Sequence, residues 1–458
     1  MMKVLGEISK FSRSLLHMNK ILLLFFLTAS FSNLQAQSNL EPCGQTQYIE
    51  QLNIRFPGYR DAYESHHQEA IRNLEVKKSF KNQPEDTIFS IPVVFHILYR
   101  TPIENVHDSL IISQMKVLND AFRRLNSDTI FTRDIFKPIA ADARINFYLA
   151  AKDPLGNPTN GITRTQTTLT TFYNDNFDDR MKFTSQGGKD AWDPTRYLNI
   201  WVCNHSNPAN PNSLILGYAT PPTNAAFWSA NSFSPISRQG VVLHYPIVGK
   251  NNPANNGSYS IDEKSAVHEV GHYLGLRHTW GDGNSFNGCS VDDGVFDTPN
   301  TRVKHSGCNK GLNTCGAGTA GDMPDQAENY MDYSSAYCTN MFTQGQVNLM
   351  RYNLNLLRST VPDREFIMPE SEKVFKTTLY PNPSNGVVTL EMQLTDPISV
   401  YKISIKDLIG QEAQVIKSSL TNMNVFDLSG LASGMYFFEL YHANGKRLIR
   451  QKILITEN

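Results

Sequence analysis

The segment from His268 to His278 reads HEVGHYLGLRH, and its residue types and spacing suit metal chemistry. In a helix, His268 and His272 lie four residues apart on one face, where their imidazoles can bind a single metal ion. Glu269 directly follows His268, so its carboxylate can reach a metal-bound water instead of the metal. The pattern therefore predicts a metal site with an adjacent carboxylate base.

The end of the same segment predicts a third nitrogen ligand. Gly275 allows the helix to end in a left-handed turn, so that the returning chain can bring His278 to the metal. Three neutral imidazoles and one open position are typical of a catalytic zinc site, in which Glu269 would accept the proton of the activated water. The alternative, that the histidines only satisfy hydrogen bonds, fits a bare His-Glu-x-x-His better than this extended pattern.

Two capping-box pairs predict helices near this segment. Ser260 and Glu263 are expected to begin the helix that carries the histidines, and Thr343 and Gln346 the helix that closes the domain. Strand-forming runs are expected at residues 87–99, 143–151, 197–204 and 240–245, with a helix at 109–125. Strands interleaved with helices predict an α/β or α+β domain over residues 87–360.

Composition divides the rest of the chain into four segments. Residues 1–36 are interpreted as a signal peptide cut after Ala36, with Met18 as an alternative start. Residues 37–86 are polar with weak helical periodicity, which predicts a detachable helical pro-segment, and residues 361–376 are expected to be a linker. Residues 377–458 contain short strand-like runs and the hairpin signal Asn444-Gly445, which predict a small all-β sandwich.

Charge and hydropathy exclude some classes of partner. The chain has 458 residues and a formal net charge of -1, which does not favour nucleic acid or an anionic membrane surface. The apolar core of the signal peptide has about a dozen residues, whereas a membrane-spanning helix needs about 20. We therefore expect no nucleic-acid partner and no transmembrane helix in the mature chain. The six cysteines suggest disulfides in an exported protein, but the sequence does not select their pairing.

The segments HEVGHYLGLRH, HTWGDGN and NYMDYSS resemble the pappalysin family of the metzincin zinc metallopeptidases, over roughly residues 88–360. The resemblance implies an α/β (α+β) catalytic domain with a mixed twisted sheet, backing helices and a zinc cleft. It also implies that Met331 forms a tight turn beneath the metal and that Tyr333 binds the zinc or the oxyanion. The alternatives are an ordinary core methionine and an ordinary interface tyrosine.

The same resemblance implies two disulfides and a second metal. The disulfides would join Cys289 to Cys315 and Cys308 to Cys338 in the loop-rich part of the domain. A structural calcium ion would bind the carboxylate of Asp293, the carbonyl of Val295 and Thr298, all of which are hard oxygen donors. The alternative at this position is an acidic, solvated turn stabilised by its own hydrogen bonds.

The resemblance to the metzincins also implies a means of latency and a place for substrate binding. Cys43, in EPCGQ, would occupy the fourth zinc position and keep the enzyme inactive. The alternative is a disulfide with Cys203, although Cys203 lies in the apolar run YLNIWVCN and is expected to be a buried free thiol. Residues 214–220 (LILGYAT) are expected to form an edge strand along which a substrate binds antiparallel.

One position departs from the family pattern and predicts an altered specificity. Tyr337 stands immediately before Cys338, where some relatives carry an acidic residue that favours a basic side chain after the cleaved bond. A tyrosine would instead favour large apolar or aromatic side chains. The alternative is that Tyr337 points away and Asp332 or a loop residue lines the pocket.

The C-terminal segment resembles the sorting domain of the type IX secretion system of certain Gram-negative bacteria. The likeness is carried by YPNPSNG, LSGLASGMYFFEL and NGKRLIRQKILI. It implies export by that machinery and a protein that is secreted or attached to the bacterial cell surface. The alternative is a β-sandwich that binds carbohydrate or protein.

The combined expectation is a secreted zinc endopeptidase, made as a latent zymogen, that hydrolyses internal bonds of protein or peptide substrates. Two other classes are considered. One is a surface adhesin on a peptidase-like scaffold, and the other is a hydrolase of a non-peptide amide. A scaffold without turnover would have no reason to keep Glu269, the three histidines and Met331 together.

Overall fold

The computed structural model describes residues 42–76, 88–210, 215–222, 236–255, 263–282, 288–359, 374–394, 400–419, 423–442 and 447–456. The predicted signal peptide, residues 361–373 of the linker and the Asn444-Gly445 turn lie outside these ranges. Among the described residues, no helix is both long enough and apolar enough to cross a membrane.

A six-stranded mixed sheet organises the histidine-bearing domain. Its strands are β1 (Phe89–Tyr99), β2 (Ile145–Leu149), β3 (Ile162–Gln166), β4 (Leu198–Cys203), β5 (Gly217–Thr220) and β6 (Gly240–His244). The order is β2-β1-β4-β6-β5, in which the first four are parallel and β5 is the antiparallel edge strand. The 11-residue strand β1 also pairs with β3 beyond the end of β2. This sheet agrees with the expected mixed α/β architecture.

Two helices pack against the sheet, and the second carries two of the three histidines. α4 (Asp108–Phe122) contacts β2, and α5 (Ser265–Tyr273) contacts β5, β6 and α4. The prediction for the start of α5 is wrong at Glu263, which lies in a turn before the helix, where its carbonyl accepts a 2.8 Å hydrogen bond from Gln114. Ser260 lies outside the described residues.

The closing helix begins as the sequence predicts. α6 (Gln344–Ser359) follows Thr343, whose backbone N–H donates to Oε1 of Gln346 at 3.0 Å. The backbone N–H of Gln346 donates in return to the hydroxyl of Thr343 at 3.2 Å. These reciprocal bonds satisfy two of the N–H groups that a helix start leaves without partners.

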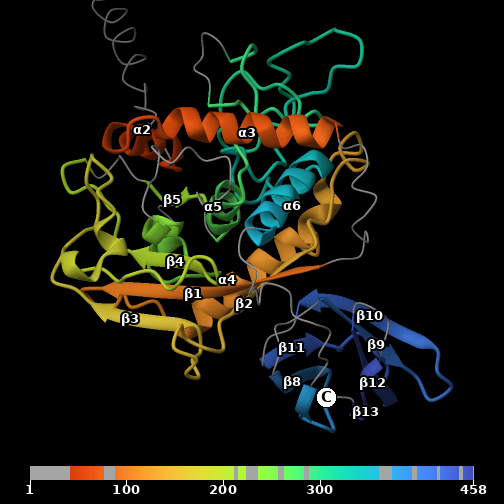
Figure 1. Cartoon of the computed structure of the whole chain (residues 1–458). Helices are drawn as coiled ribbons and strands as arrows, with labels where there is room; N and C mark the ends of the chain where they lie inside the picture. The colour runs from red at the N-terminus through yellow and green to blue at the C-terminus, as the bar shows by residue number, and fades with distance from the viewer. Residues whose placement is uncertain are drawn as a thin grey trace, which may run out of the picture. The chain divides into compact units, whose positions relative to one another are not determined.

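The described part of the predicted pro-segment is helical. It contains α2 (Gln45–Arg55) and α3 (Tyr59–Val76), of which α2 contacts β5 and α3 contacts α6. Figure 1 shows both helices across the side of the domain on which β5 and α5 lie. Tyr48, Leu52 and Tyr59 are fully buried in a cluster that also contains Tyr218 and Trp201 of the sheet. The pro-segment is therefore packed into the domain by apolar burial.

The C-terminal residues form two antiparallel sheets. The first contains β7 (Val374–Tyr380), β8 (Val387–Leu394) and β11 (Met423–Asp427). The second contains β9 (Val400–Lys406), β10 (Glu412–Ser419), β12 (Gly434–His442) and β13 (Arg447–Ile455). Leu390 of the first sheet and Ile405 and Phe438 of the second belong to one buried cluster. Two sheets sharing a core make a β-sandwich, as predicted.

Candidate metal centre

Helix α5 and the turn that follows it supply the three histidines. His268 and His272 lie on α5, which is buried along its whole length. The helix ends at Tyr273, and Gly275, two residues later, has a φ of +93° and an N–H that donates to the carbonyl of His272 at 2.9 Å. A Cβ at this position would also lie 2.1 Å from Nδ2 of Asn353. Glycine is therefore required for the turn that brings His278 back to the helix.

The three Nε2 atoms converge on one point. They lie 3.1 Å apart between His268 and His272, 3.1 Å between His272 and His278, and 3.2 Å between His268 and His278. The Nδ1 atoms of His268 and His272 donate to the carbonyls of Tyr330 and Leu276 at 2.7 and 2.9 Å. A carbonyl can only accept, so in a neutral ring each Nε2 presents a lone pair to the others.

Burial keeps two of these rings in the protonation state that a cation requires. Burial and neighbouring His278 lower the pKa of His268 to about 3, and burial lowers the pKa of His272 well below its usual value. Burial also raises the pKa of Glu269 to about 8, although a hydrogen bond from Cys43 opposes the shift. Burial accordingly favours the neutral form of the rings of His268 and His272.

The donor set fits zinc. Lone pairs about 3 Å apart repel each other unless a cation lies between them. A tetrahedral ion with Zn–N bonds of about 2.1 Å separates its ligands by roughly 3.4 Å, close to the observed spacing. The carbonyls at Nδ1 fix the orientation of two rings, as partners of metal-bound histidines commonly do.

Two residues that follow the helix in the sequence, Met331 and Tyr333, lie close to the histidine cluster. Met331 packs against Gly271, where a Cβ would lie 2.5 Å from its sulfur. Met331 is fully buried. The ring of Tyr333 lies 5.8 Å from that of His268 and 5.0 Å from that of His278. Its hydroxyl donates to the carbonyl of Cys43 at 3.1 Å.

Cys43 lies at the open side of the histidine cluster. Its sulfur and one nitrogen of each histidine are all within 4.8 Å of one another. Burial, and then the nearby carboxyl of Glu269, raise the pKa of the Cys43 thiol. The thiol donates to Oε2 of Glu269 at 3.6 Å. One pro-segment residue thus contacts both the metal-binding groups and the carboxylate predicted to act as base.

The pro-segment reaches this position by pairing with the edge strand. Cys43 forms a parallel bridge to Gly217, the first residue of β5. The Leu216 N–H donates to the carbonyl of Pro42, and the Gly44 N–H to the carbonyl of Gly217, both at 2.8 Å. The strand lies within the predicted range 214–220, of which Leu214 is outside the described residues.

The cysteines pair as the resemblance implied. Disulfides join Cys289 to Cys315 and Cys308 to Cys338. Cys43 and Cys203 are buried free thiols, so the alternative disulfide between these two residues is not formed.

The loop with the predicted calcium ligands contains buried oxygen atoms without partners. Oδ2 of Asp293 and the hydroxyl of Thr298 make no hydrogen bond with any described residue. Burial raises the pKa of Asp293 well above its usual range. The carbonyl of Val295 accepts from the Thr298 N–H at 3.1 Å, which closes the loop. Buried oxygens of this kind fit a hard cation.

The structure corrects the prediction for Tyr337. A cavity beside the metal centre is lined by Asp332, Ala336, Lys264 and other residues, whereas Tyr337 does not line it and is 70% exposed. The Cys338 N–H donates to the carbonyl of Ser335 at 2.8 Å, which makes a tight turn. Such a turn directs successive side chains apart, so Ala336 faces the cavity and Tyr337 faces solvent.

Three further residues contact the site and were not found from the sequence. Asp282 accepts a hydrogen bond from Nδ1 of His278. Trp280 stacks on the ring of His278 with centroids 4.3 Å apart and planes 7° apart. Gly217 leaves room for Glu269, since a Cβ there would lie 2.7 Å from its Cγ. A signal for Asp282 was present, because an acid four residues after a ligand histidine can bind its second nitrogen.

Fold and site together define a metzincin-type zinc peptidase centre. Residues 182–355 match the family model described as pregnancy-associated plasma protein-A, and residues 378–456 match the secretion system C-terminal sorting domain. The chain belongs to the pappalysin family of metallopeptidases and carries a type IX secretion sorting domain. The protein is accordingly secreted or attached to the bacterial cell surface.

Solved structures of related proteins support this assignment. Tannerella forsythia mature mirolysin, in complex with a cleaved peptide, is 39% identical with a TM-score of 0.51; the match covers 60% of this chain and 98% of that chain. A mutant of Tannerella forsythia promirolysin is 38% identical with a TM-score of 0.57, covering 69% and 96%.

A curated relative matches over a shorter stretch. Extracellular metalloprotease 1 of Coccidioides posadasii is 40% identical over 131 residues, which are 29% of this chain. The chain spans 42% of the length of that relative.

Proposed function

We propose that the protein is a zinc-dependent endopeptidase that is made as a latent zymogen. The observation that carries the proposal is the convergence of three histidine Nε2 atoms beside the buried carboxyl of Glu269. When bound, zinc supplies a Lewis acid that polarises the scissile carbonyl and acidifies a water molecule. Glu269 takes a proton from the attacking water and delivers it to the leaving amine. Tyr333 donates its hydroxyl to the developing oxyanion.

Substrate is proposed to bind along β5. In the zymogen, the N–H groups of Leu216 and Ala219 and the carbonyl of Gly217 are paired with residues 42–45. Once the pro-segment has left, these groups are available to the main chain of a substrate. Main-chain pairing holds an extended peptide across Glu269 without selecting its side chains.

Latency is proposed to depend on Cys43. Its sulfur lies where a fourth ligand would complete the coordination of the three histidines. A thiolate is a strong zinc ligand, so it would exclude water from that position. The hydrogen bond to Glu269 would also occupy the base.

A structural calcium ion is proposed at Asp293, Val295 and Thr298. The support is the pair of buried oxygens without partners and the hard-donor character of all three groups. The pro-segment contacts this loop, because Nε2 of His67 donates to the carbonyl of Asp293 at 2.8 Å.

Digestion of casein tests the central proposal. The full chain is activated by removal of the pro-segment, treated with a chelator, dialysed and reloaded with zinc. We expect hydrolysis that the chelator abolishes and zinc restores. An adhesin would bind casein without cleaving it, and an amidase for another class of substrate would leave casein intact while hydrolysing small amides.

A further inference from the structure

Tyr48 of the pro-segment fills a preformed pocket in the catalytic domain. The side chain is fully buried, and its ring lies 4.5 Å from that of Tyr218 and 5.8 Å from that of Phe177, centroid to centroid. Its hydroxyl donates to Oδ2 of Asp179 at 2.8 Å and lies 2.7 Å from the hydroxyl of Thr220. The occupant is thus recognised both by its ring and by its polar tip.

The polar floor of this pocket is built by the catalytic domain alone. Nζ of the buried Lys182 donates to the hydroxyl of Thr220 at 2.8 Å and to the carbonyl of Arg238 at 2.9 Å. Lys182 and Arg238 also pair with Asp179 at 3.2 and 2.6 Å. Lys182 Nζ also donates to the hydroxyl of Tyr48 at 3.4 Å, but the four contacts above do not involve the pro-segment and do not depend on its presence.

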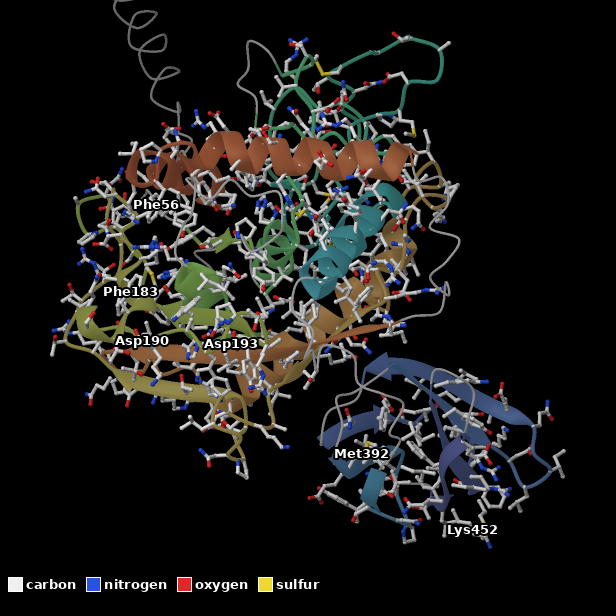
Figure 2. The ribbon with its side chains drawn as sticks, viewed as in Figure 1. Phe56, Phe183, Asp190, Asp193, Met392 and Lys452 are labelled. Carbon is white, nitrogen blue, oxygen red and sulfur yellow. A yellow bond between two sulfur atoms is a disulfide. The ribbon has the colours of Figure 1, made fainter. Side chains whose placement is uncertain are left out.

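A pro-segment residue also contacts one of the charged groups near this pocket. The guanidinium of Arg238 lies between the rings of Phe56 and Phe183, 5.9 and 4.9 Å from their centroids. Figure 2 labels both phenylalanines, Phe56 at the pro-segment helices and Phe183 nearer the sheet.

The pocket lies at one defined end of the proposed substrate strand. Cys43 pairs with Gly217 at the start of β5, whereas Tyr48 contacts Thr220 at its end. A substrate that runs antiparallel to β5, with its scissile bond at the histidines, has its earlier residues beside Thr220. The pocket therefore faces residues on the N-terminal side of the cleaved bond.

We propose that, in the mature enzyme, the pocket formed by Phe177, Asp179, Lys182, Tyr218 and Thr220 binds a tyrosine side chain of the substrate on the N-terminal side of the scissile bond. The inference rests on the proposed peptidase function and on the direction of substrate along β5. A phenol fits because its hydroxyl donates to Asp179 while accepting from the donors beside it. Phenylalanine fills the same volume but leaves the Asp179 carboxylate one donor short.

Peptide hydrolysis tests the proposal. The zinc-loaded full chain, activated by removal of its pro-segment, is given quenched fluorescent peptides in which one tyrosine occupies each of the four positions before the cleaved bond in turn. Matched peptides carry phenylalanine or alanine there. We expect kcat/KM at one position to be about 10- to 100-fold higher for tyrosine than for phenylalanine, as for a lost hydrogen bond to a charged group.

A pair of variants locates the effect. Thr220→Val removes one of the two hydrogen-bond partners of the phenol and is expected to reduce the tyrosine-to-phenylalanine ratio by roughly two- to tenfold, whereas Thr165→Val on β3 leaves the ratio unchanged. If Thr220→Val does not fold, the ratio in the parent enzyme decides alone. Similar rates for all three residues at every position would overturn the inference while leaving the peptidase proposal intact. Failure to cleave casein would instead refute the peptidase proposal itself.

Discussion

The thiol of Cys43 lies 3.6 Å from Oε2 of Glu269, although the two residues are 226 positions apart in the sequence. The same sulfur is within 4.8 Å of a nitrogen on each of the three histidines. A single pro-segment atom therefore lies beside both the histidine cluster and the proposed base. Its removal should affect latency more than removal of any other pro-segment side chain.

Substitution of Cys43 by alanine should activate the intact chain. Without the sulfur, water can reach the metal position even while α2 and α3 remain packed on the domain. We expect casein hydrolysis by the uncleaved Cys43→Ala chain to exceed that of the uncleaved parent by at least about tenfold, since thiolate ligation excludes water. Cys203→Ala, which removes the other buried free thiol, is the matched control and should stay latent. Equal latency of both variants would assign inhibition to the helices alone.

Substitution of Glu269 by alanine should abolish hydrolysis without loss of zinc. The three histidines keep their ring contacts, while the group that moves the proton is gone. The expected loss in kcat is about 10²- to 10⁴-fold, the usual contribution of a general base. Zinc content of the purified variant, measured by atomic absorption, should match that of the parent. Activity near the parental level would contradict the mechanism.

Calcium should stabilise the domain through Asp293. At a free concentration of about 100 times its Kd, a ligand adds roughly 2.7 kcal/mol to the stability of the folded state. We expect calcium, and not an equal concentration of magnesium, to raise Tm in the parent. Asp293→Ala should lose that increase, whereas Asp292→Ala, at the exposed neighbouring position, should keep it. A calcium-dependent Tm in Asp293→Ala would place the ion elsewhere.

His305 should make stability fall at alkaline pH. Burial alone lowers its pKa, but the carboxyls of Asp325 and Asp332, each 3.0 Å from one ring nitrogen, raise the pKa to about 10. This exceeds the unfolded value of about 6.5, so the contribution is complete below that pH and is lost as the pH rises towards 10. Replacement by glutamine should remove this part of the pH dependence.

Tryptophan fluorescence during urea unfolding measures the effect. All four tryptophans lie between residues 192 and 280, so the signal reports the catalytic domain and not the β-sandwich. The parent should lose on the order of a few kcal/mol between pH 6.5 and 10 relative to His305→Gln. Parallel pH curves for the two proteins would show that His305 is neutral in the folded state.

Local patterns made part of this structure predictable. The capping box at Thr343 and Gln346 and the left-handed glycine at Gly275 depend on residues within a few positions of one another, and both are found as expected. The spacing of the histidines is similarly local. A tertiary contact explains why strand β3 (ITRTQ) was not predicted. It has little apolar character, and it forms because it pairs with Phe95–Tyr99 of β1.

The direction of individual side chains and the contacts between distant residues could not be predicted from the sequence. Whether Tyr337 or Ala336 faces the cavity depends on one turn anchored by the disulfide of Cys338, and the pattern around Met331 does not determine it. The bond between Tyr48 and Asp179 joins residues 131 positions apart. No short motif marks such a pair, because each residue alone resembles an ordinary helix or loop residue.

The parallel pairing of Cys43 with Gly217 bears on the kinetic order of activation. A peptide that lies along β5 in this direction runs opposite to the antiparallel substrate proposed above, so its amide bonds are presented to Glu269 in the reverse direction. The bonds from Pro42 to Gln45 therefore resist hydrolysis while the stretch stays in place, and they can be cut only after it has left and entered an active centre in the opposite direction. We therefore expect one molecule of active enzyme to cleave the pro-segment of another molecule. The time course of activation should be sigmoidal, with a lag that shortens as protein concentration rises or when a trace of mature enzyme is added.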